Sequence, residues 1–325
     1  MIGKNEAGQR MDKYLKKYFR EAGSGFLYKM LRKKNILLNG KKAEGKEMLR
    51  EGDTVTLYLA DDTIEKFRGT VAEKTQESAL YPRTQLDILY EDSHFIILNK
   101  PAGMLSQKAA PKDVSMVEYL IGYLLDEKKI TGEELGTFHP SVCNRLDRNT
   151  SGIVLAGKTL SGLQFLSEML KERSMKKYYL CLVKGQVSRR QHCRAYLMKD
   201  SRNNQVKVSD TPQEGASMIE TAYEPLWKGR EATLLKVELI TGKSHQIRSH
   251  LASLGYPLAG DPKYGSQGWN RELKTRTGLN RQFLHAWQVE FPSMDGIGKT
   301  LSEKTIEAPL PDDLAAALEW IKDRN

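Results

Sequence analysis

The sequence predicts an α+β protein with a large mixed, mostly antiparallel β-sheet and flanking helices, preceded by a small pair of helices. Two observations lead to this prediction. Strand-like segments outnumber helix-like ones in the larger part of the chain, and short connections join neighbouring strands, which favours antiparallel pairing. The five clearest strand segments in succession are 177–184, 193–198, 205–209, 217–224 and 232–240.

Length and composition indicate a globular protein with more than one domain. The chain has 325 residues, and 39% of them are hydrophobic, which is enough for a sizeable core. The formal net charge is +10, and residues 1–60 alone hold 14 basic and 7 acidic side chains. A basic module therefore precedes a nearly neutral body, and this excess favours a polyanionic partner.

Several other classes of protein are disfavoured by the sequence. The N-terminal residues lack the apolar stretch of a secretion signal, and the sequence has no long uncharged apolar run for membrane spanning. The three cysteines show no Cys-x-x-Cys spacing, which argues against a disulfide framework and against a zinc knuckle. We therefore expect a cytoplasmic protein with reduced thiols.

Residues 1–60 are expected to form a small basic module. Its predicted elements are helices over 10–21 and 25–34, the second capped by Ser24, a hairpin turn at Asn39-Gly40 and a strand over 54–59. The second helix leaves four basic side chains for solvent or phosphate: Lys29, Arg32, Lys33 and Lys34.

Two basic helices and a hairpin that ends in Leu49-Arg50-Glu51-Gly52-Asp53 resemble the S4 RNA-binding domain. Clustered lysines and arginines on a helix contact phosphates through charge and do not read the base sequence. The resemblance therefore implies that this module binds RNA. A solvated, lysine-rich surface is the alternative interpretation.

Residues 86–325 form the predicted large domain, which follows a polar, charged linker over 61–85. Besides the five strands, it is expected to contain strands at 88–90, 95–98 and 284–291, a helix that begins at the capping box Ser115-x-x-Glu118, and helices at 160–173, 244–254 and 312–322.

A polar loop in the large domain is the leading candidate for a functional site. Residues 144–152 read Asn-Arg-Leu-Asp-Arg-Asn-Thr-Ser-Gly and continue directly into the apolar run 153–156. The Asp, Asn, Thr, Ser and Gly of this segment favour loops. A strand directly behind the loop would hold Arg145 and Asp147 against a rigid support. A polar turn in which Asp147 is a local cap is the simpler interpretation for an isolated aspartate.

Three further segments could supply side chains to the same site. They are the strand start with Tyr178 and Tyr179, the helix start Thr241–His250 with Lys243, His245, Gln246 and Arg248, and the loop 260–265. His245 and His250 are five residues apart, so a helix would place them about 140° apart around its axis. They do not form the i, i+4 pair of a metal site, and no metal is expected.

Together these segments resemble the RluA family of pseudouridine synthases. The resemblance is carried by Arg145-Leu146-Asp147-x-x-Thr150-Ser151-Gly152 and, about a hundred residues later, by His245-Gln246-Ile247-Arg248. It covers roughly residues 86–300. It implies a cofactor-free isomerisation of uridine to pseudouridine in structured RNA, with large-subunit ribosomal RNA as the expected substrate and partner.

The resemblance also implies roles for individual residues. Asp147 matches the catalytic aspartate, thought to be a nucleophile; Tyr179, or its neighbour Tyr178, matches the tyrosine that packs on the target base; Arg248 matches the basic partner of the carboxylate; and Arg145 matches the arginine that fills the gap left by the flipped nucleotide. Lys100, Lys243, His245 and Gln246 are the other expected substrate contacts.

These residue types suit the implied reaction. Taking a base out of a stacked helix costs a few kcal/mol. A planar guanidinium can replace part of the lost stacking, and an aromatic ring can receive the base. An arginine within about 4–6 Å of a carboxylate lowers the pKa of that carboxylate and keeps it ionised.

Two other functions remain open on sequence grounds. One is a non-catalytic RNA-binding or ribosome-assembly factor on the same scaffold. The other is an N-glycosylase or glycosidase, which usually needs two acidic groups around the bond, whereas only Asp147 is a convincing candidate. Asn144 stands where the family usually has histidine, and it flanks an otherwise intact motif.

Overall fold

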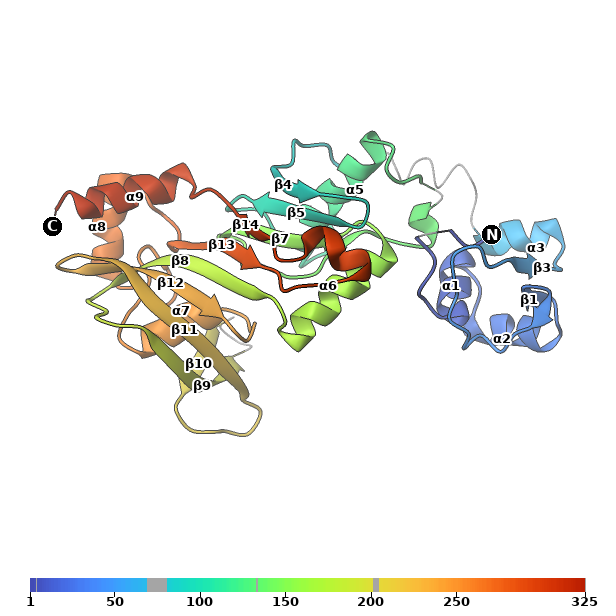
Figure 1. Cartoon of the computed structure of the whole chain (residues 1–325), viewed down its shortest axis with the longest axis horizontal. Helices are drawn as coiled ribbons and strands as arrows, with labels where there is room; N and C mark the ends of the chain where they lie inside the picture. Colours follow the sequence, from blue (N-terminus) through green and yellow to red (C-terminus); the bar gives the residue numbers. More distant parts are fainter. Residues whose placement is uncertain (4, 69–80, 133, 201–204, 325) are drawn as a thin grey trace. The chain divides into compact units, whose positions relative to one another are not determined.

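The computed structural model describes residues 1–3, 5–68, 81–132, 134–200 and 205–324 (Figure 1). The chain divides into two compact units, each formed by several segments. The first unit is Met1–Ile96, Gln107–Cys143 and Leu155–Glu168, and the second is Ile97–Ser106, Asn144–Val154 and Met169–Asn325. In the part of the chain that is described, no helix is both long and apolar enough to cross a membrane.

The N-terminal module of the first unit contains the expected helix pair and hairpin. Its elements are α1 (Met11–Tyr18), α2 (Ser24–Arg32), β1 (Ile36–Leu38), β2 (Lys41–Lys42) and β3 (Val55–Leu57). The three strands pair in the order β2-β1-β3. Asn39 and Gly40 have φ angles of 50° and 72°, the geometry that a two-residue hairpin turn requires. The predicted cap is wrong, because Gly23 occupies the N-cap position and Ser24 is the first helical residue.

The structure departs from the prediction at the start of the expected linker. Residues Asp61–Arg68 form a helix, α3. Ile64 and Phe67 of this helix pack against the buried core of the N-terminal module, which includes Leu15 and Leu31. Ile64 and Phe67 are the only large apolar side chains of this helix, and charged residues surround them. Two apolar residues are too few to show a helical period in the sequence. Residues 69–80 of the predicted linker lie outside the described residues.

The rest of the first unit contains the beginning of the large sheet and helices beside it. Its elements are β4 (Ile88–Glu91), the start of β5 (Phe95–Lys100), α5 (Met116–Asp126), a short 3₁₀ helix (Glu134–Gly136), β6 (Ser141–Val142), the end of β7 (Ser151–Gly157) and most of α6 (Leu160–Glu172). The predicted capping box is confirmed, because the Ser115 and Glu118 side chains each accept a backbone N–H of this turn.

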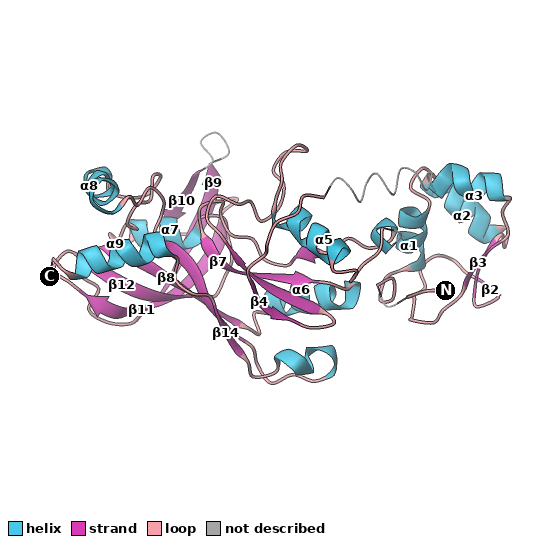
Figure 2. Ribbon diagram, turned by 90° about the horizontal axis from the view of Figure 1, so that it is seen from above, coloured by secondary structure: helices cyan, strands magenta, loops and turns pink. Residues whose placement is uncertain are grey.

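The second unit is built on the antiparallel part of the large sheet (Figure 2). Besides the end of β5 and the start of β7, its strands are β8 (Lys176–Lys184), β9 (Gln191–Asp200), β10 (Gln205–Ser209), β11 (Ser217–Lys228), β12 (Ala232–Leu239), β13 (Leu284–Glu290) and β14 (Thr305–Glu307). Among the described residues, the strand order of the whole sheet is β10-β9-β11-β12-β8-β13-β7-β5-β4, with β14 beside β13 and β6 beside β7. The predicted mixed, mostly antiparallel sheet is therefore confirmed.

One parallel contact connects the sheet to the polar loop 144–150. His285 and Ala286 of β13 pair with Ser151 and Gly152 at the start of β7. Gly152 has a φ of +108°, and a Cβ atom at this position would lie 2.2 Å from the Ala286 carbonyl oxygen. Only glycine fits here, and the polar loop is thereby held to the centre of the sheet where its last residues enter β7.

Helices complete the second unit. They are α7 (Gln246–Ser253), α8 (Gln267–Thr277), a 3₁₀ helix (Gly296–Leu301) and α9 (Asp312–Lys322). Helix α9 matches the predicted bounds, and its apolar side chains share a core with Trp269 and Leu273 of α8. Helix α8 was not predicted. Trp269 and Leu273 are its only buried residues, and a single i, i+4 apolar pair does not stand out from a polar loop.

Candidate active site

The polar loop 144–150 is held rigidly, because its successive backbone groups have fixed partners within the second unit. The Ser106 hydroxyl lies 3.0 Å from the Leu146 carbonyl and 2.9 Å from the Leu146 nitrogen. The Thr150 N–H donates to the Asp147 carbonyl at 3.0 Å, and the Gly103 N–H donates to the Arg148 carbonyl at 2.9 Å. A loop whose backbone groups are satisfied in this way presents its side chains from a defined position.

Lys100 holds this loop through hydrogen bonds to backbone carbonyls. Its ammonium group donates to the carbonyls of Pro101, Met104 and Arg148 at 2.8, 2.8 and 3.0 Å, and the residue is completely buried. Burial, with a contribution from Arg281, lowers the pKa of Lys100 to about 7. The sequence suggested a substrate contact, whereas the structure uses all three donors of the ammonium group for the loop itself.

Asp147 is held by a buried arginine. Arg248 donates from Nη1 to Oδ2 of Asp147 at 2.8 Å, and it grips Asp261 through Nε and Nη2 at 2.7 and 2.9 Å. Arg248 is 4% exposed and Asp261 is 1% exposed, while the Asp147 side chain keeps 27% of its surface. One guanidinium therefore joins an internal carboxylate and an accessible one, an arrangement that we term the Asp147–Arg248–Asp261 triad.

The pKa values of the triad follow from these contacts. Burial opposes ionisation of Asp261, but the hydrogen bonds and charge of Arg248 outweigh it and lower the pKa of Asp261. Burial also opposes the charge on Arg248, yet the two carboxylates raise the pKa of Arg248 above its ordinary value. The guanidinium is thus a permanent cation beside Asp147.

Tyr179 lies on β8 beside this group and lines the same cavity as Asp147. The side chain is buried, and burial, reinforced by the charge of Asp147, raises the pKa of the phenol well above its ordinary value. The ring therefore stays neutral over the physiological pH range. It offers an aromatic surface next to a carboxylate.

Tyr178 is placed elsewhere. Consecutive residues of a strand point to opposite faces of the sheet. The ring centroid of Tyr178 lies 4.0 Å from the Lys236 ammonium, and its hydroxyl lies 3.4 Å from the Glu290 carboxylate. It lines a different cavity of about 190 Å³, and burial raises the pKa of its phenol to about 12. Of the two tyrosines considered from the sequence, only Tyr179 is brought to Asp147.

His245 and Gln246 lie at the start of α7 and have different tasks. His245 has a left-handed backbone with φ 55°; its Nδ1 is 2.9 Å from the Tyr264 hydroxyl, and its Nε2 is 4.0 Å from Asp147. Burial lowers the pKa of His245 below its ordinary value. A strained backbone at such a place is typical of functional sites.

Gln246 is an internal brace. Its Nε2 donates to the Glu220 carbonyl and the Thr221 hydroxyl, both at 3.0 Å. Its Oε1 accepts from the Thr241 hydroxyl at 2.9 Å and from the Lys243 N–H at 3.1 Å. All hydrogen-bonding positions of the amide are used within the protein, although the residue lines the cavity.

These residues surround a small cavity of about 60 Å³. It is lined by Arg145, Leu146, Asp147, Thr150, Tyr179, Leu239, Lys243, His245, Gln246, Ile247, Arg248 and Leu284. Arg145 and Lys243 are exposed and contribute cationic side chains to its opening, while the carboxylate, the phenol and the imidazole lie deeper. Lys100 and Tyr178 do not line it. Sequence reasoning missed Asp261, whose only signal was its place in the loop Gly260–Gly265.

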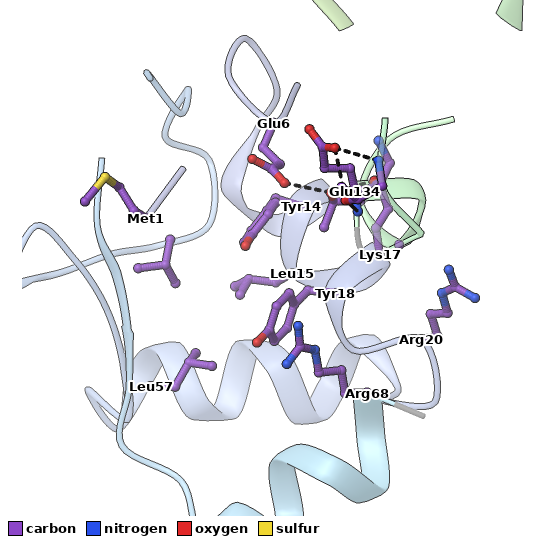
Figure 3. Close-up of a pocket in the computed structure, with 14 residues that line it drawn as sticks. Met1, Glu6, Tyr14, Leu15, Lys17, Tyr18, Arg20, Leu57, Arg68 and Glu134 are labelled. Atoms are coloured by element: carbon purple, nitrogen blue, oxygen red, sulfur yellow. Dashed lines mark hydrogen bonds between the residues drawn. The ribbon is translucent and has the colours of Figure 1, made fainter. Parts of the chain in front are cut away.

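The basic residues predicted for RNA contact in the N-terminal module are exposed. Lys29 and Arg32 lie in the last turn of α2, and Lys33 and Lys34 follow it. The structure adds a further basic group, which the sequence did not indicate, around a cavity of about 370 Å³ in the first unit (Figure 3). Lys17 and Arg68 line it, and the Arg68 guanidinium lies 4.8 Å from the Tyr18 ring centroid.

Comparison with known proteins agrees with the geometry of the site. Residues 94–253 match the family model described as RNA pseudouridylate synthase. The ribosomal large subunit pseudouridine synthase C of Escherichia coli K12 is 33% identical over 330 residues, covering 99% of this chain and 96% of that protein. The protein of the same name from Vibrio parahaemolyticus is 31% identical, covering 100% of this chain and 96% of that protein.

Solved structures give the same fold. Human RNA Pseudouridylate Synthase Domain Containing 4 superposes with a TM-score of 0.58 at 18% identity, covering 78% of this chain and 98% of that one. Human RNA Pseudouridylate Synthase Domain Containing 1 gives 0.51 at 21% identity, covering 70% and 84%. The sequence matches extend over nearly the whole length of both chains, so the chain belongs to the RNA pseudouridylate synthase family and is an isomerase that acts on RNA.

Proposed function

We propose that this chain converts uridine to pseudouridine in ribosomal RNA of the large subunit, with Asp147 as the catalytic nucleophile. The observation that carries this proposal is the Asp147 carboxylate, which is held by a buried Arg248 and lines one cavity with the Tyr179 ring. A protein that only bound RNA would gain nothing from a carboxylate there, since it would repel phosphates.

The reaction is an isomerisation in which atoms and electrons balance without a cofactor. Asp147 attacks C1′ of the ribose, the C1′–N1 bond breaks, and its electron pair leaves with the uracil ring. The ring turns and its C5 forms a bond to C1′ as the carboxylate departs. The proton lost from C5 is balanced by the proton gained at N1, so the product has the composition of the substrate.

The remaining residues of the cavity bind and orient the nucleotide in this proposal. Tyr179 packs on the base, which must leave its stack at a cost of a few kcal/mol. Arg145 is exposed, and its planar guanidinium can occupy the vacated position. Lys243, also exposed, contacts a backbone phosphate in this proposal, and Arg248 holds Asp147 in position through the hydrogen bond from its Nη1.

Two observations favour ribosomal RNA as the substrate. The curated relatives from Escherichia coli and Vibrio parahaemolyticus carry the large ribosomal subunit in their names and match over the full chain. The exposed basic residues 29–34 of the N-terminal module suit a structured polyanion, as an S4-like domain would. We place the protein in the cytoplasm, which also suits its three free cysteines.

An Asp147→Asn variant tests the reaction. Large-subunit ribosomal RNA transcribed without modifications is incubated with either protein, and pseudouridine is measured by mass spectrometry. We expect the variant to lose activity by at least about a thousandfold while its RNA affinity changes little. Asp295→Asn, at an exposed aspartate in a loop, is the matched control and should keep full activity.

Each of the alternative functions predicts a different result in that experiment. Pseudouridine formation that survives Asp147→Asn would refute the role of this residue. A non-catalytic assembly factor would give no pseudouridine with either protein. Release of free uracil by the unaltered protein would indicate a glycosylase instead.

A further inference from the structure

Residues 281–285 of the second unit contact the end of the polar loop. Arg281 donates from Nη1 to the Asn149 carbonyl at 3.2 Å. Gln282 donates from Nε2 to the Thr150 hydroxyl at 3.2 Å, and Nδ1 of His285 lies 3.0 Å from the Ser151 hydroxyl. The last two loop residues and Ser151, the first residue of β7, are thus bound by the side chains of Arg281, Gln282 and His285, which are all buried.

The direction of the hydrogen bonds at His285 follows from its second partner. Nε2 lies 3.2 Å from the Ala308 carbonyl, which can only accept, so Nε2 carries the proton. Nδ1 therefore accepts from the Ser151 hydroxyl. Burial lowers the pKa of His285 to about 4, which agrees with a neutral ring in this bridge.

Arg281 is itself held from the C-terminal helix. Its Nε and Nη2 donate to Oδ2 and Oδ1 of Asp313 at 2.6 and 2.8 Å, a bidentate pair in which the Arg281 side chain is 5% exposed. Asp313 lies in the first turn of α9. Because this fork fixes the plane of the guanidinium, it also fixes the direction of Nη1 toward the Asn149 carbonyl.

Helix α9 is a firm base for such a contact. Leu314, Ala317, Leu318 and Ile321 are buried in the core that also contains Phe283 of the 281–285 segment. The helix and the segment therefore belong to one packed body. A displacement of Asp313 would be transmitted through Arg281 to a carbonyl two residues beyond Asp147.

We propose that Arg281, oriented by Asp313, is a positioning residue that sets the Asp147 carboxylate in its reactive place. The proposal rests on the nucleophilic role given to Asp147. If the only task of Arg281 were to attach α9, its two hydrogen bonds to the Asp313 carboxylate would be sufficient. Its third nitrogen, Nη1, donates instead to the Asn149 carbonyl of the loop. Lys100 does the same for the preceding carbonyl, that of Arg148, so two buried basic side chains hold two successive carbonyls of the loop.

The test uses full-length Asp313→Ala and Arg281→Lys variants and two readouts. The first is the single-turnover rate of pseudouridine formation in unmodified large-subunit ribosomal RNA, measured together with the RNA dissociation constant. The second is hydrogen exchange of the Thr150 amide, which is bonded to the Asp147 carbonyl. We expect the rate to fall at least about tenfold, the dissociation constant to stay within about twofold, and the amide to exchange at least about tenfold faster.

Two further variants separate positioning from general damage. Asp313→Glu restores a carboxylate and should recover most of the rate, which also keeps the test decisive if Asp313→Ala folds poorly. Glu272→Gln is the matched control: it removes the acidic partner of Arg324, at the other end of α9, and touches nothing in the loop. Its rate and its Thr150 exchange should equal those of the unaltered protein.

The two proposals fail in different ways. Unchanged Thr150 exchange in folded Asp313→Ala and Arg281→Lys variants would refute the positioning contact, whether or not the protein is active on the RNA. Faster exchange with an unchanged rate would show that the contact exists but has no catalytic consequence, which also overturns the inference. Full activity of Asp147→Asn would instead refute the proposed reaction.

Discussion

At the scale of single residues, the chemistry of the site depends on how one guanidinium is shared. Arg248 gives two of its nitrogens to Asp261, which is fully buried, and one to Asp147, which is accessible. The buried carboxylate therefore acts as an orienting group, while the accessible one remains available to a substrate. A site of this form requires both acids, although only one can touch the nucleotide.

Replacing the buried acid should affect both stability and activity. Asp261→Asn removes the charge that compensates Arg248 in the interior, and breaking a buried ion pair on one side costs about 3–5 kcal/mol. The misplaced guanidinium should also reduce the rate by about tenfold to a hundredfold. Urea unfolding and single-turnover kinetics measure the two effects, and an active variant of unchanged stability would contradict this account.

Lys100 should give the stability of the protein a particular pH dependence. Its pKa is about 7 in the folded protein and 10.5 in an ordinary lysine. Between these values the unfolded chain binds more protons, so the contribution of Lys100 to the free energy of unfolding rises with pH, by at most about 1.4 kcal/mol per pH unit. Below about pH 7 both states are protonated and this dependence vanishes.

The comparison of Lys100→Met with the unaltered protein isolates that contribution. The free energy of unfolding of both proteins is measured in urea at about pH 6 and at about pH 9. Relative to the Lys100→Met variant, the unaltered protein should be more stable at the higher pH than at the lower. Parallel pH profiles would mean that Lys100 has an ordinary pKa.

At the scale of elements, the loop is defined by the strands and helices around it. The start of β7 is locked to β13 at Gly152, the 97–106 segment supplies Lys100 and Ser106, and α7 supplies Arg248. Residues distant in sequence therefore meet because the sheet brings their elements together.

The contact at Gly152 should not tolerate a side chain. Gly152→Ala places a Cβ atom against the Ala286 backbone and forces alanine into a left-handed conformation, and we expect a loss of more than about 2 kcal/mol. Gly268→Ala is the matched control, because nothing lies within 4 Å of its Cβ position in α8. That change should stabilise the protein by up to about 1 kcal/mol. Thermal unfolding of both variants distinguishes the two outcomes.

The sequence predicted the elements with strong periods and missed those with weak ones. Strand β10 and helix α9 have the predicted bounds, because alternation and the 3.6-residue period are clear in them. Helices α3 and α8 carry two inward apolar side chains each, too few to define a period. The alternation of β8 could not decide between Tyr178 and Tyr179, since both faces of that strand are largely buried.

The site residues that lie in a continuous sequence motif were predicted. Contacts between residues that only folding brings together were not. Asp147 and Arg248 were recognised by their motifs, and the structure brings them together. The inward orientation of Lys100 and the pairing of Arg281 with Asp313 depend on tertiary packing, which no local pattern encodes.

At the scale of the whole molecule, charge is unevenly distributed between a basic N-terminal module and a nearly neutral remainder. Binding to a polyanion through such a module should depend steeply on salt, because each phosphate contact releases a counterion. We expect the specificity of the reaction to lie in the cavity around Asp147 and the N-terminal module to contribute affinity for the RNA. The S4-like interpretation of this module stays a prediction.

Neutralising the exposed basic residues 29 and 32–34 tests this division. The variant with Lys29, Arg32, Lys33 and Lys34 all changed to Gln should bind ribosomal RNA more weakly, with a logarithmic salt slope reduced by up to about 3. Its single-turnover rate at saturating protein should remain near that of the unaltered chain. The same change at Arg271, Lys274, Arg276 and Lys299, which are also exposed, is the control for net charge. If the control variant showed an equal decrease in salt slope, the N-terminal module would have no special role in RNA binding.

The sharing of Arg248 has an electrostatic consequence for how a nucleic acid can enter. The triad contains two carboxyl groups and one guanidinium, so its formal net charge at pH 7 is negative. A phosphodiester that came directly over it would be repelled, while the uncharged nucleobase and sugar would not. We therefore expect the RNA strand to run past the opening of the cavity, along Arg145 and Lys243, and to turn only its target nucleoside inward.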